Sequence, residues 1–117
     1  MPTEELKDLF YNLFNIDIID SKYRDFDFEK KFYKKVSKLK EKEIFNLLDK
    51  VVEILSAEDF SHYKNLRYDL KKYRRVYVNK SYVIIFYDAN KKVYFVDYDH
   101  HDKIYKNWFS IILSQYL

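Results

Sequence analysis

The absence of glycine is the feature that most restricts this chain, since none of its 117 residues is glycine. Loops that cradle phosphates and turns that bind dinucleotides need a residue that accepts positive φ and lets a ligand approach the backbone closely. The sequence therefore excludes P-loop, Rossmann and nucleophile-elbow sites. Cysteine is absent as well, which excludes disulfide scaffolds, cysteine-ligated zinc and thiol nucleophiles.

The length and composition indicate one folded domain. Hydrophobic residues make up 48% of the chain and aromatic residues 21%, which is enough for a packed interior. The chain has no cationic start followed by an apolar run, and no stretch approaches the ~18 apolar residues of a membrane span. We therefore expect a cytoplasmic protein with no membrane partner.

Apolar residues recur at helical spacing in three segments of the first half. They predict helices over residues 3–15, 27–40 and 41–56, the first with Thr3 as its N-cap. The short connection between the last two indicates a helical hairpin. Residues 15–27 are interpreted as a linker, in which Ile16, Ile18 and Ile19 either form a short strand or anchor the connection.

The pattern changes to alternation in the second half. Residues 75–79, 82–87 and 93–98 predict three strands in a meander, with turn residues at 88–91. A terminal helix is predicted from Asp102. The expected fold class is α+β, with the N-terminal helices packed on one face of a small antiparallel sheet and a C-terminal helix after it.

The charges divide the chain into an acidic and a basic part. Residues 1–61 carry 11 basic and 14 acidic side chains, whereas residues 62–106 carry 11 and 5. A basic second half is what a polyanion-binding surface needs, because neutralising phosphates releases counterions. A uniformly charged surface of the thermophile kind is the alternative interpretation.

The segment 64–75 concentrates the positive charge. It has six cationic residues and one acidic residue, with tyrosines at positions 68 and 73 and another directly before it at position 63. Cations bind phosphates and tyrosine rings stack on unpaired bases, so this pattern is typical of single-stranded nucleic-acid binding. A solvated connection to the first strand of the meander explains it equally simply.

Two histidines lie where the last strand meets the last helix. A histidine side chain can act as a general acid or base near neutral pH, so His100 and His101 are both candidates for this role. Adjacent histidines on a strand point to opposite faces, so we expect no metal site and no cofactor. Asp99 and Asp102 are interpreted as helix-capping residues. Tyr105 lies one helical turn after His101 and either stacks on a base or packs.

Three runs resemble the RelE/ParE toxin superfamily of toxin–antitoxin systems, most closely its RelE-like and YafQ-like mRNA interferases. They are residues 64–78, residues 81–86 and residues 93–105, the last ending in His-His-Asp-Lys-Ile-Tyr. The resemblance implies a RelE-like toxin domain over 26–117 behind a helical extension over 1–25. It also implies an endoribonuclease that cuts messenger RNA on the ribosome and is neutralised by a cognate antitoxin.

The resemblance implies site residues too. His101 is the expected general acid, with Tyr105 as the base-stacking or proton-handling aromatic residue, and with Arg75 and Lys64 in the catalytic set. The expected RNA-binding residues are Arg67, Lys71, Lys72, Arg74, Tyr77 and Lys80.

Three positions depart from the family pattern, namely Val83, Tyr77 and Ser81. They leave an alternative open, in which the chain is a non-catalytic binder on the same fold, such as an inhibitor of DNA gyrase or a protein that only binds nucleic acid or an antitoxin.

Overall fold

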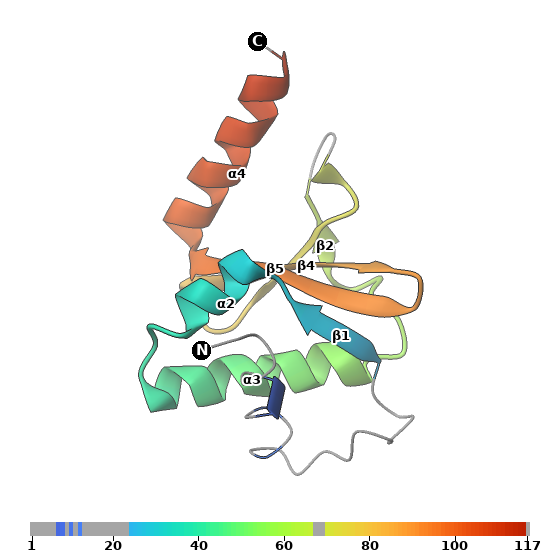
Figure 1. Ribbon diagram of the computed structural model, residues 1–117. Helices are drawn as coiled ribbons and strands as arrows, with labels where there is room; N and C mark the ends of the chain where they lie inside the picture. The colour runs from blue at the N-terminus through green and yellow to red at the C-terminus, as the bar shows by residue number, and fades with distance from the viewer. Residues whose placement is uncertain (1–6, 9, 11, 13–23, 67–69, 117) are drawn as a thin grey trace.

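The computed structural model describes residues 7, 8, 10, 12, 24–66 and 70–116. Its centre is a five-stranded sheet in the order β1-β5-β4-β3-β2. Helices α2 (Lys30–Val36) and α3 (Glu41–Ser56) lie on one side of the sheet, and α4 (His101–Tyr116) rises from the end of β5 (Lys92–His100) away from them (Figure 1). The structure therefore has the expected α+β class.

The predicted meander is confirmed. It consists of β3 (Arg74–Tyr77), β4 (Tyr82–Ala89) and β5 (Lys92–His100), paired antiparallel in sequence order. A short strand β2 (Lys64–Asn65) pairs antiparallel with β3 and extends the sheet by one strand. The basic segment after residue 63 thus enters the sheet before it loops back into β3.

A strand that the sequence analysis missed forms the opposite edge. β1 (Asp25–Phe28) pairs parallel with the start of β5, where a linker and the start of a helix were expected. In the run Asp-Phe-Asp-Phe the aromatic residues alternate, and both Phe26 and Phe28 are buried. Because this alternation has the period of a strand, these residues bury their rings against the sheet better than a helix would allow.

The predicted helical hairpin is present with a later start. α2 (Lys30–Val36) is shorter than the expected helix over 27–40, because the first residues of that segment belong to β1. α3 (Glu41–Ser56) has the predicted bounds. The Glu43 side chain accepts a hydrogen bond from the Lys40 N–H at 3.2 Å, which satisfies one of the free amides at the start of α3.

The tight turns form without glycine. Asn90 and Lys91, between β4 and β5, have φ values of 54° and 65°, as a two-residue type I′ hairpin requires. Between β3 and β4, the Asn79 side chain accepts hydrogen bonds from the Ser81 and Tyr82 N–H groups at 2.8 and 3.1 Å. Asparagine therefore occupies turn positions at which glycine is often found.

Each face of the sheet has its own core. The larger core joins α2 and α3 to inward residues of β1, β4 and β5, including Phe28, Phe86 and Phe95. The smaller core lies on the other face, where Val83 and Ile85 pack with Ile104 and Trp108 of α4 (His101–Tyr116). Helices thus cover both faces, whereas the sequence predicted helices packed on one face of the sheet.

A bulge in β5 decides which residues face α4. Phe86 pairs with Phe95 while Ile85 pairs with Asp97, so Val96 has no partner in this register. Directly opposite residues share a face of the sheet. The extra residue therefore turns Asp97 away from the Phe95 face and toward the face on which α4 packs.

The predicted helix over residues 3–15 lies largely outside the described residues. Among those that are described, Phe10 is fully buried in the larger core, with its ring centroid 5.2 Å from that of Phe26. The Lys7 Nζ donates a hydrogen bond of 2.9 Å to the carbonyl oxygen of Phe26. This part of the N-terminal segment therefore packs on the edge strand β1. No helix in the described part of the chain has the length and apolar character needed to span a membrane.

Candidate active site

Strand β3 carries two of the predicted site residues on the face where α4 begins. Arg75 and Tyr77 pair with Ile85 and Val83 of β4, which belong to the smaller core beneath α4. Paired residues point to the same side, so these two side chains lie beside the first turns of the helix.

Tyr105 of α4 joins these side chains into a connected group. The Arg75 guanidinium donates a 2.8 Å hydrogen bond to the Tyr105 hydroxyl and lies 5.3 Å from the centre of its ring. The Tyr77 and Tyr105 hydroxyl oxygens are 3.3 Å apart. The sequence spacing could not give this convergence, because it depends on how α4 crosses the sheet.

His101 lies at the first position of α4, next to this group. Its backbone N–H donates to the Ser81 carbonyl oxygen at 2.7 Å, which fixes the start of the helix against the β3–β4 turn. Its ring centroid is 6.5 Å from that of Tyr77. The imidazole is about one-third exposed, so a ligand can reach it from solvent.

Lys64 lies opposite Arg75 on the neighbouring strand β2 and is exposed. Opposite residues of an antiparallel pair have Cβ atoms only about 5 Å apart. Lys64 and Arg75 are therefore neighbours on the same face of the sheet, and Arg75 is the one that contacts Tyr105. We define these candidate site residues, Lys64, Arg75, Tyr77, His101 and Tyr105, as the catalytic cluster, a name that refers to the role predicted for them from the sequence.

Burial raises the pKa of the Tyr105 phenol, and the hydrogen bond with Tyr77 raises it further, while the Arg75 guanidinium acts in the opposite direction. The net direction is upward, so the phenol is protonated at neutral pH. Tyr105 can therefore accept the hydrogen bond from Arg75 and donate its own proton to an acceptor. The resting form of Tyr105 is the protonated phenol and not a phenolate that could accept a proton.

The remaining predicted RNA-binding residues do not gather in one place. The Lys72 ammonium lies 4.9 and 4.8 Å from the ring centres of Tyr73 and Tyr87. Lys71 and Lys80 are exposed on the loops before and after β3. Arg67 lies outside the described residues.

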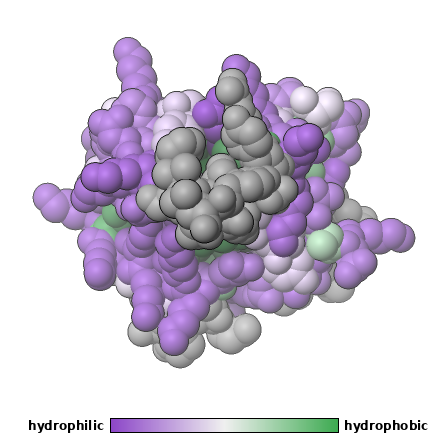
Figure 2. Space-filling model, turned by 90° about the horizontal axis from the view of Figure 1, so that it is seen from above, coloured by the Kyte–Doolittle hydropathy of each residue, from purple (hydrophilic) through white to green (hydrophobic). Residues whose placement is uncertain are grey.

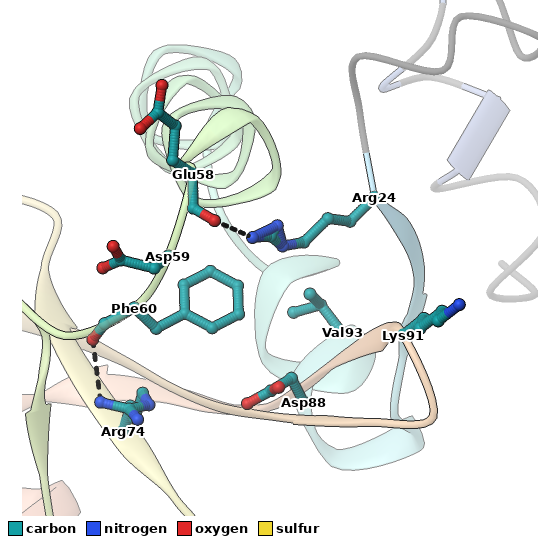
Figure 3. Close-up of a pocket in the computed structure, with 8 residues that line it drawn as sticks. All are labelled: Arg24, Glu58, Asp59, Phe60, Arg74, Asp88, Lys91 and Val93. Carbon is teal, nitrogen blue, oxygen red and sulfur yellow. Dashed lines mark hydrogen bonds between the residues drawn. The ribbon is translucent and has the colours of Figure 1, made fainter.

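Arg74 lies on the opposite face from the catalytic cluster. Its guanidinium donates to the carbonyl oxygens of Phe60 and Tyr63 at 2.8 and 3.0 Å, so it holds the loop after α3 against the sheet. Figure 3 shows it at a pocket whose charged lining balances three cations against three carboxylates: Arg24, Arg74 and Lys91 against Glu58, Asp59 and Asp88. This balanced lining favours no polyanion.

Asp97 is a buried residue that connects two helices, and its partners were not predicted from the sequence. Its side chain is fully buried and accepts hydrogen bonds from Lys35 at 2.7 Å and from the Trp108 indole at 2.9 Å, with the Lys31 ammonium at 3.1 Å. The carboxylate thus ties α2 to α4 across β5. An acidic residue inside an otherwise apolar strand was the signal, because a buried carboxylate needs partners.

Burial is the largest single influence on the pKa of the Asp97 carboxyl, but the contacts of the carboxylate together outweigh it. Burial alone would raise the pKa of the Asp97 carboxyl, but the hydrogen bonds from Lys35, Trp108 and Lys31 lower it overall. Burial also opposes the charge of Lys35, yet its hydrogen bonds to Asp97 and Asp99 raise the pKa of Lys35 overall. Both groups are therefore charged at neutral pH.

The two adjacent histidines lie together rather than on opposite faces. His100 ends β5 and His101 begins α4, and their ring centroids are 4.6 Å apart. The alternation of a strand does not extend across this junction. Within the described residues, ligand atoms of His100, His101 and Asp102 all lie within 4.8 Å of one another.

The surface around α4 suits a polar ligand. Figure 2 looks down on the side from which α4 rises, and the surface there is mostly hydrophilic, with hydrophobic residues visible only in small areas. Val83, which departs from the family pattern, is fully buried beneath this face. The positive charge next to Tyr105 therefore comes from β3 and β2 rather than from position 83.

No protein-family model matches the chain. Two solved structures share its fold at 18% sequence identity. The toxin–antitoxin complex RelBE2 from Mycobacterium tuberculosis superposes with a TM-score of 0.57 over 67% of this chain and 91% of that one. YafQ from Escherichia coli strain BL21(DE3) superposes with a TM-score of 0.56 over 70% of this chain and 98% of that one.

A sequence relative is much closer. A Methanocaldococcus jannaschii protein named "Putative toxin RelE4" is 45% identical over 78 residues, which are 65% of this chain and 81% of that protein. An identity of this level over most of the relative's length, together with the shared fold, establishes the family. The chain belongs to the RelE family of toxins of toxin–antitoxin systems.

Proposed function

We propose that this protein is the toxin of a toxin–antitoxin system and acts as an endoribonuclease on messenger RNA, with the ribosome as the place of cleavage. The observation that carries the proposal is the hydrogen-bonded contact of Arg75, Tyr105 and Tyr77 beside His101. It combines a proton donor, a fixed cation and aromatic faces on one accessible surface. Messenger RNA and ribosomes as partners locate the activity in the cytoplasm.

The proposed reaction is attack of a ribose 2′-hydroxyl on the adjacent phosphate. The new O–P bond gives a 2′,3′-cyclic phosphate, the bond to the 5′-oxygen breaks, and that oxygen takes up a proton. His101 in its protonated form supplies this proton as general acid, and solvent takes the proton of the 2′-hydroxyl. The one-third exposed imidazole leaves room for RNA to approach.

The cations stabilise the charge that develops on the phosphate oxygens. Arg75 is held by its hydrogen bond to Tyr105, so its guanidinium is oriented before RNA binds. Preorganised charge is worth more than charge that must reorient during the reaction. Lys64, opposite Arg75 on β2, adds a second positive charge at the same place.

The two tyrosines align the RNA. Tyr105 is neutral because burial and the Tyr77 hydrogen bond raise its pKa, so its hydroxyl donates to a phosphate oxygen while its ring offers a stacking face. Tyr77 is 42% exposed and offers a second ring. Alignment of the attacking oxygen with the leaving oxygen supplies much of the acceleration in such reactions.

A cognate antitoxin is the proposed regulatory partner. A structural neighbour of this chain is a toxin–antitoxin complex, and the basic residues around β3 suit an acidic segment of a partner protein. Binding there would cover the catalytic cluster and keep RNA away from it.

The test is induced expression followed by primer extension on cellular messenger RNA. Wild-type protein should arrest growth and cut transcripts within codons. His101→Ala should reduce cleavage by about 10²- to 10⁴-fold, the usual loss for a general acid. Arg75→Ala should reduce it by about 10²- to 10³-fold. His62→Ala is the matched control, because His62 is exposed in the loop after α3, and it should cleave normally.

Two outcomes contradict the proposal in different ways. Normal cleavage by His101→Ala would remove His101 from the reaction. Intact transcripts accompanied by DNA damage would favour the non-catalytic alternative, inhibition of DNA gyrase.

A further inference from the structure

We infer that His100, His101 and Asp102 form a binding site for a divalent transition-metal ion of the Zn²⁺ class, and that occupation of this site switches off the RNA cleavage proposed above. The metal-binding part rests only on the geometry of these three residues. The inhibitory part rests on the proposed function of His101.

The spacing of the donor atoms is close to what a tetrahedral ion requires. Nitrogen and oxygen ligands lie about 2.0–2.1 Å from Zn²⁺, so two of them are about 3.3 Å apart. The His101 Nε2 and one Asp102 carboxylate oxygen are already 3.3 Å apart. The His100 Nδ1 and the other carboxylate oxygen are 3.8 Å apart. One ligand atom from each residue lies within 4.8 Å of the others, so the side chains must rotate to bring all three to a common ion.

The junction between β5 and α4 creates this arrangement. Residues along a strand alternate between faces, but the chain leaves the strand after His100 and turns into the helix at His101. The His100 Nδ1 points back toward this turn, since it accepts the Asp102 N–H at 3.3 Å. The ring must therefore release this hydrogen bond before its lone pair can coordinate an ion.

Neighbouring contacts limit the motion of the first ligand. The His100 ring packs edge-on against Tyr82, with ring centroids 5.5 Å apart and an interplanar angle of 83°. A ring restricted in this way loses less freedom when it binds an ion. The imidazoles are about one-third exposed and Asp102 is 81% exposed, so an ion enters without any opening of the fold.

The chemical types of the three ligands determine which metal ion the site would bind. Two imidazole nitrogens and one carboxylate suit Zn²⁺ and Cu²⁺, whereas Mg²⁺ prefers oxygen ligands in octahedral geometry. Three protein ligands leave one tetrahedral position for water. We therefore expect Zn²⁺ to bind and Mg²⁺ not to compete at millimolar concentration.

Metal binding would conflict with the proposed role of His101. An imidazole nitrogen that coordinates a metal ion has no lone pair with which to carry a proton to the leaving oxygen. The bound ion would also hold the ring toward Asp102. Zn²⁺ should therefore inhibit cleavage even though no metal takes part in the reaction.

The binding test is calorimetric titration of the full-length protein with Zn²⁺, together with NMR of the imidazole signals. We expect one Zn²⁺ per chain and shifts at His100 and His101 but not at His62. His100→Gln and Asp102→Asn should each weaken binding at least about tenfold, as loss of a ligand implies. His62→Gln should bind as the wild type does. Circular dichroism of each variant checks that it is folded.

Three outcomes overturn the site: no binding by wild-type protein at millimolar Zn²⁺, binding that His100→Gln and Asp102→Asn leave unchanged, or NMR shifts confined to His62.

The activity test separates this inference from the proposed function. In metal-free buffer, His100→Gln should cleave RNA at the wild-type rate, because His100 lies outside the catalytic cluster. Added Zn²⁺ should inhibit the wild type and leave this variant active. Equal inhibition of both proteins would refute the switch. If the wild type cleaves no RNA under any condition, the proposed function and the switch both fail, while the titration still decides whether the site exists.

Discussion

Replacing Asp97 with asparagine should lower the free energy of unfolding by about 2–3 kcal/mol. The carboxylate is fully buried and contacts Lys31, Lys35 and Trp108, which come from α2 and α4. Asparagine keeps the size and shape of the side chain but removes its charge. The substitution therefore tests the electrostatic connection between the two helices and not the packing.

The magnitude follows from what each partner loses. Removing one member of a buried ion pair costs about 3–5 kcal/mol when the other charge stays buried. Here the Lys31 and Lys35 side chains are 45% and 27% exposed, so both ammonium groups regain water and the cost is smaller. The Trp108 indole can still donate to the amide oxygen of asparagine, which preserves one of the hydrogen bonds.

The assay is urea unfolding at pH 7, with Asp99→Asn as the matched control. Asp99 contacts Lys35 at 3.0 Å but is 23% exposed, so its loss should cost at most about 1 kcal/mol. An equal loss for both variants, or a loss below about 1 kcal/mol for Asp97→Asn, would refute the reasoning. An unchanged dependence on urea concentration would show that the two folded states expose similar surface.

The same variant gives a pH dependence with a definite sign. Hydrogen bonds hold the folded-state pKa of Asp97 below its ordinary value despite burial, and the unfolded-state pKa is about 3.9. Its stabilisation is therefore complete above about pH 5 and decreases as the pH falls through the folded-state pKa. The stability difference between wild type and Asp97→Asn should stay constant from pH 7 to about pH 5 and shrink below about pH 4. A difference that grew in acid would contradict this assignment.

Two further substitutions test features of the fold by urea unfolding. Lys91→Gly should stabilise the protein by about 0.5–1 kcal/mol, because Lys91 has a φ of 65° in the β4–β5 turn and glycine adopts this conformation without strain; a loss of stability would mean that the lysine side chain matters more than its backbone. Phe10→Ala should cost about 3–5 kcal/mol, because Phe10 is fully buried against Phe26. Phe45→Ala, at a position 48% exposed, should cost less than about 1 kcal/mol, and a similar cost for both would show that the N-terminal segment adds little to the core.

The periodicity of the sequence was sufficient to predict an element where that element buries one of its faces without help from a distant segment. α3 has the predicted bounds because its apolar residues repeat over four turns. The meander was predictable because β3, β4 and β5 are close in sequence and carry strand-forming residues. β1 was not predicted, since a four-residue strand gains its stability from pairing with β5, which lies more than sixty residues later.

The candidate site also has a part that was predictable from the sequence and a part that was not. The sequence identified His101, Tyr105 and Arg75 as residue types suited to the chemistry, and a resemblance to toxins suggested their roles. The resemblance placed Arg75 in the catalytic set and Arg74 among the RNA-binding residues, but only the structure shows that the two point to opposite faces of β3. The sequence also gave no partners for Asp97, because the bulge at Val96 sets the direction of that side chain.

The sequence by itself determined the composition of this protein: no glycine, a basic second half, and a histidine and a tyrosine one helical turn apart. Local periodicity carries this information because helices and strands repeat over a few residues. Only the tertiary structure decided which side chains meet. The contact of Arg75 with Tyr105 depends on strand register and on the angle at which α4 leaves the sheet, and these are set by packing between distant segments. The approach of the two histidines to Asp102 depends on where β5 ends and α4 begins.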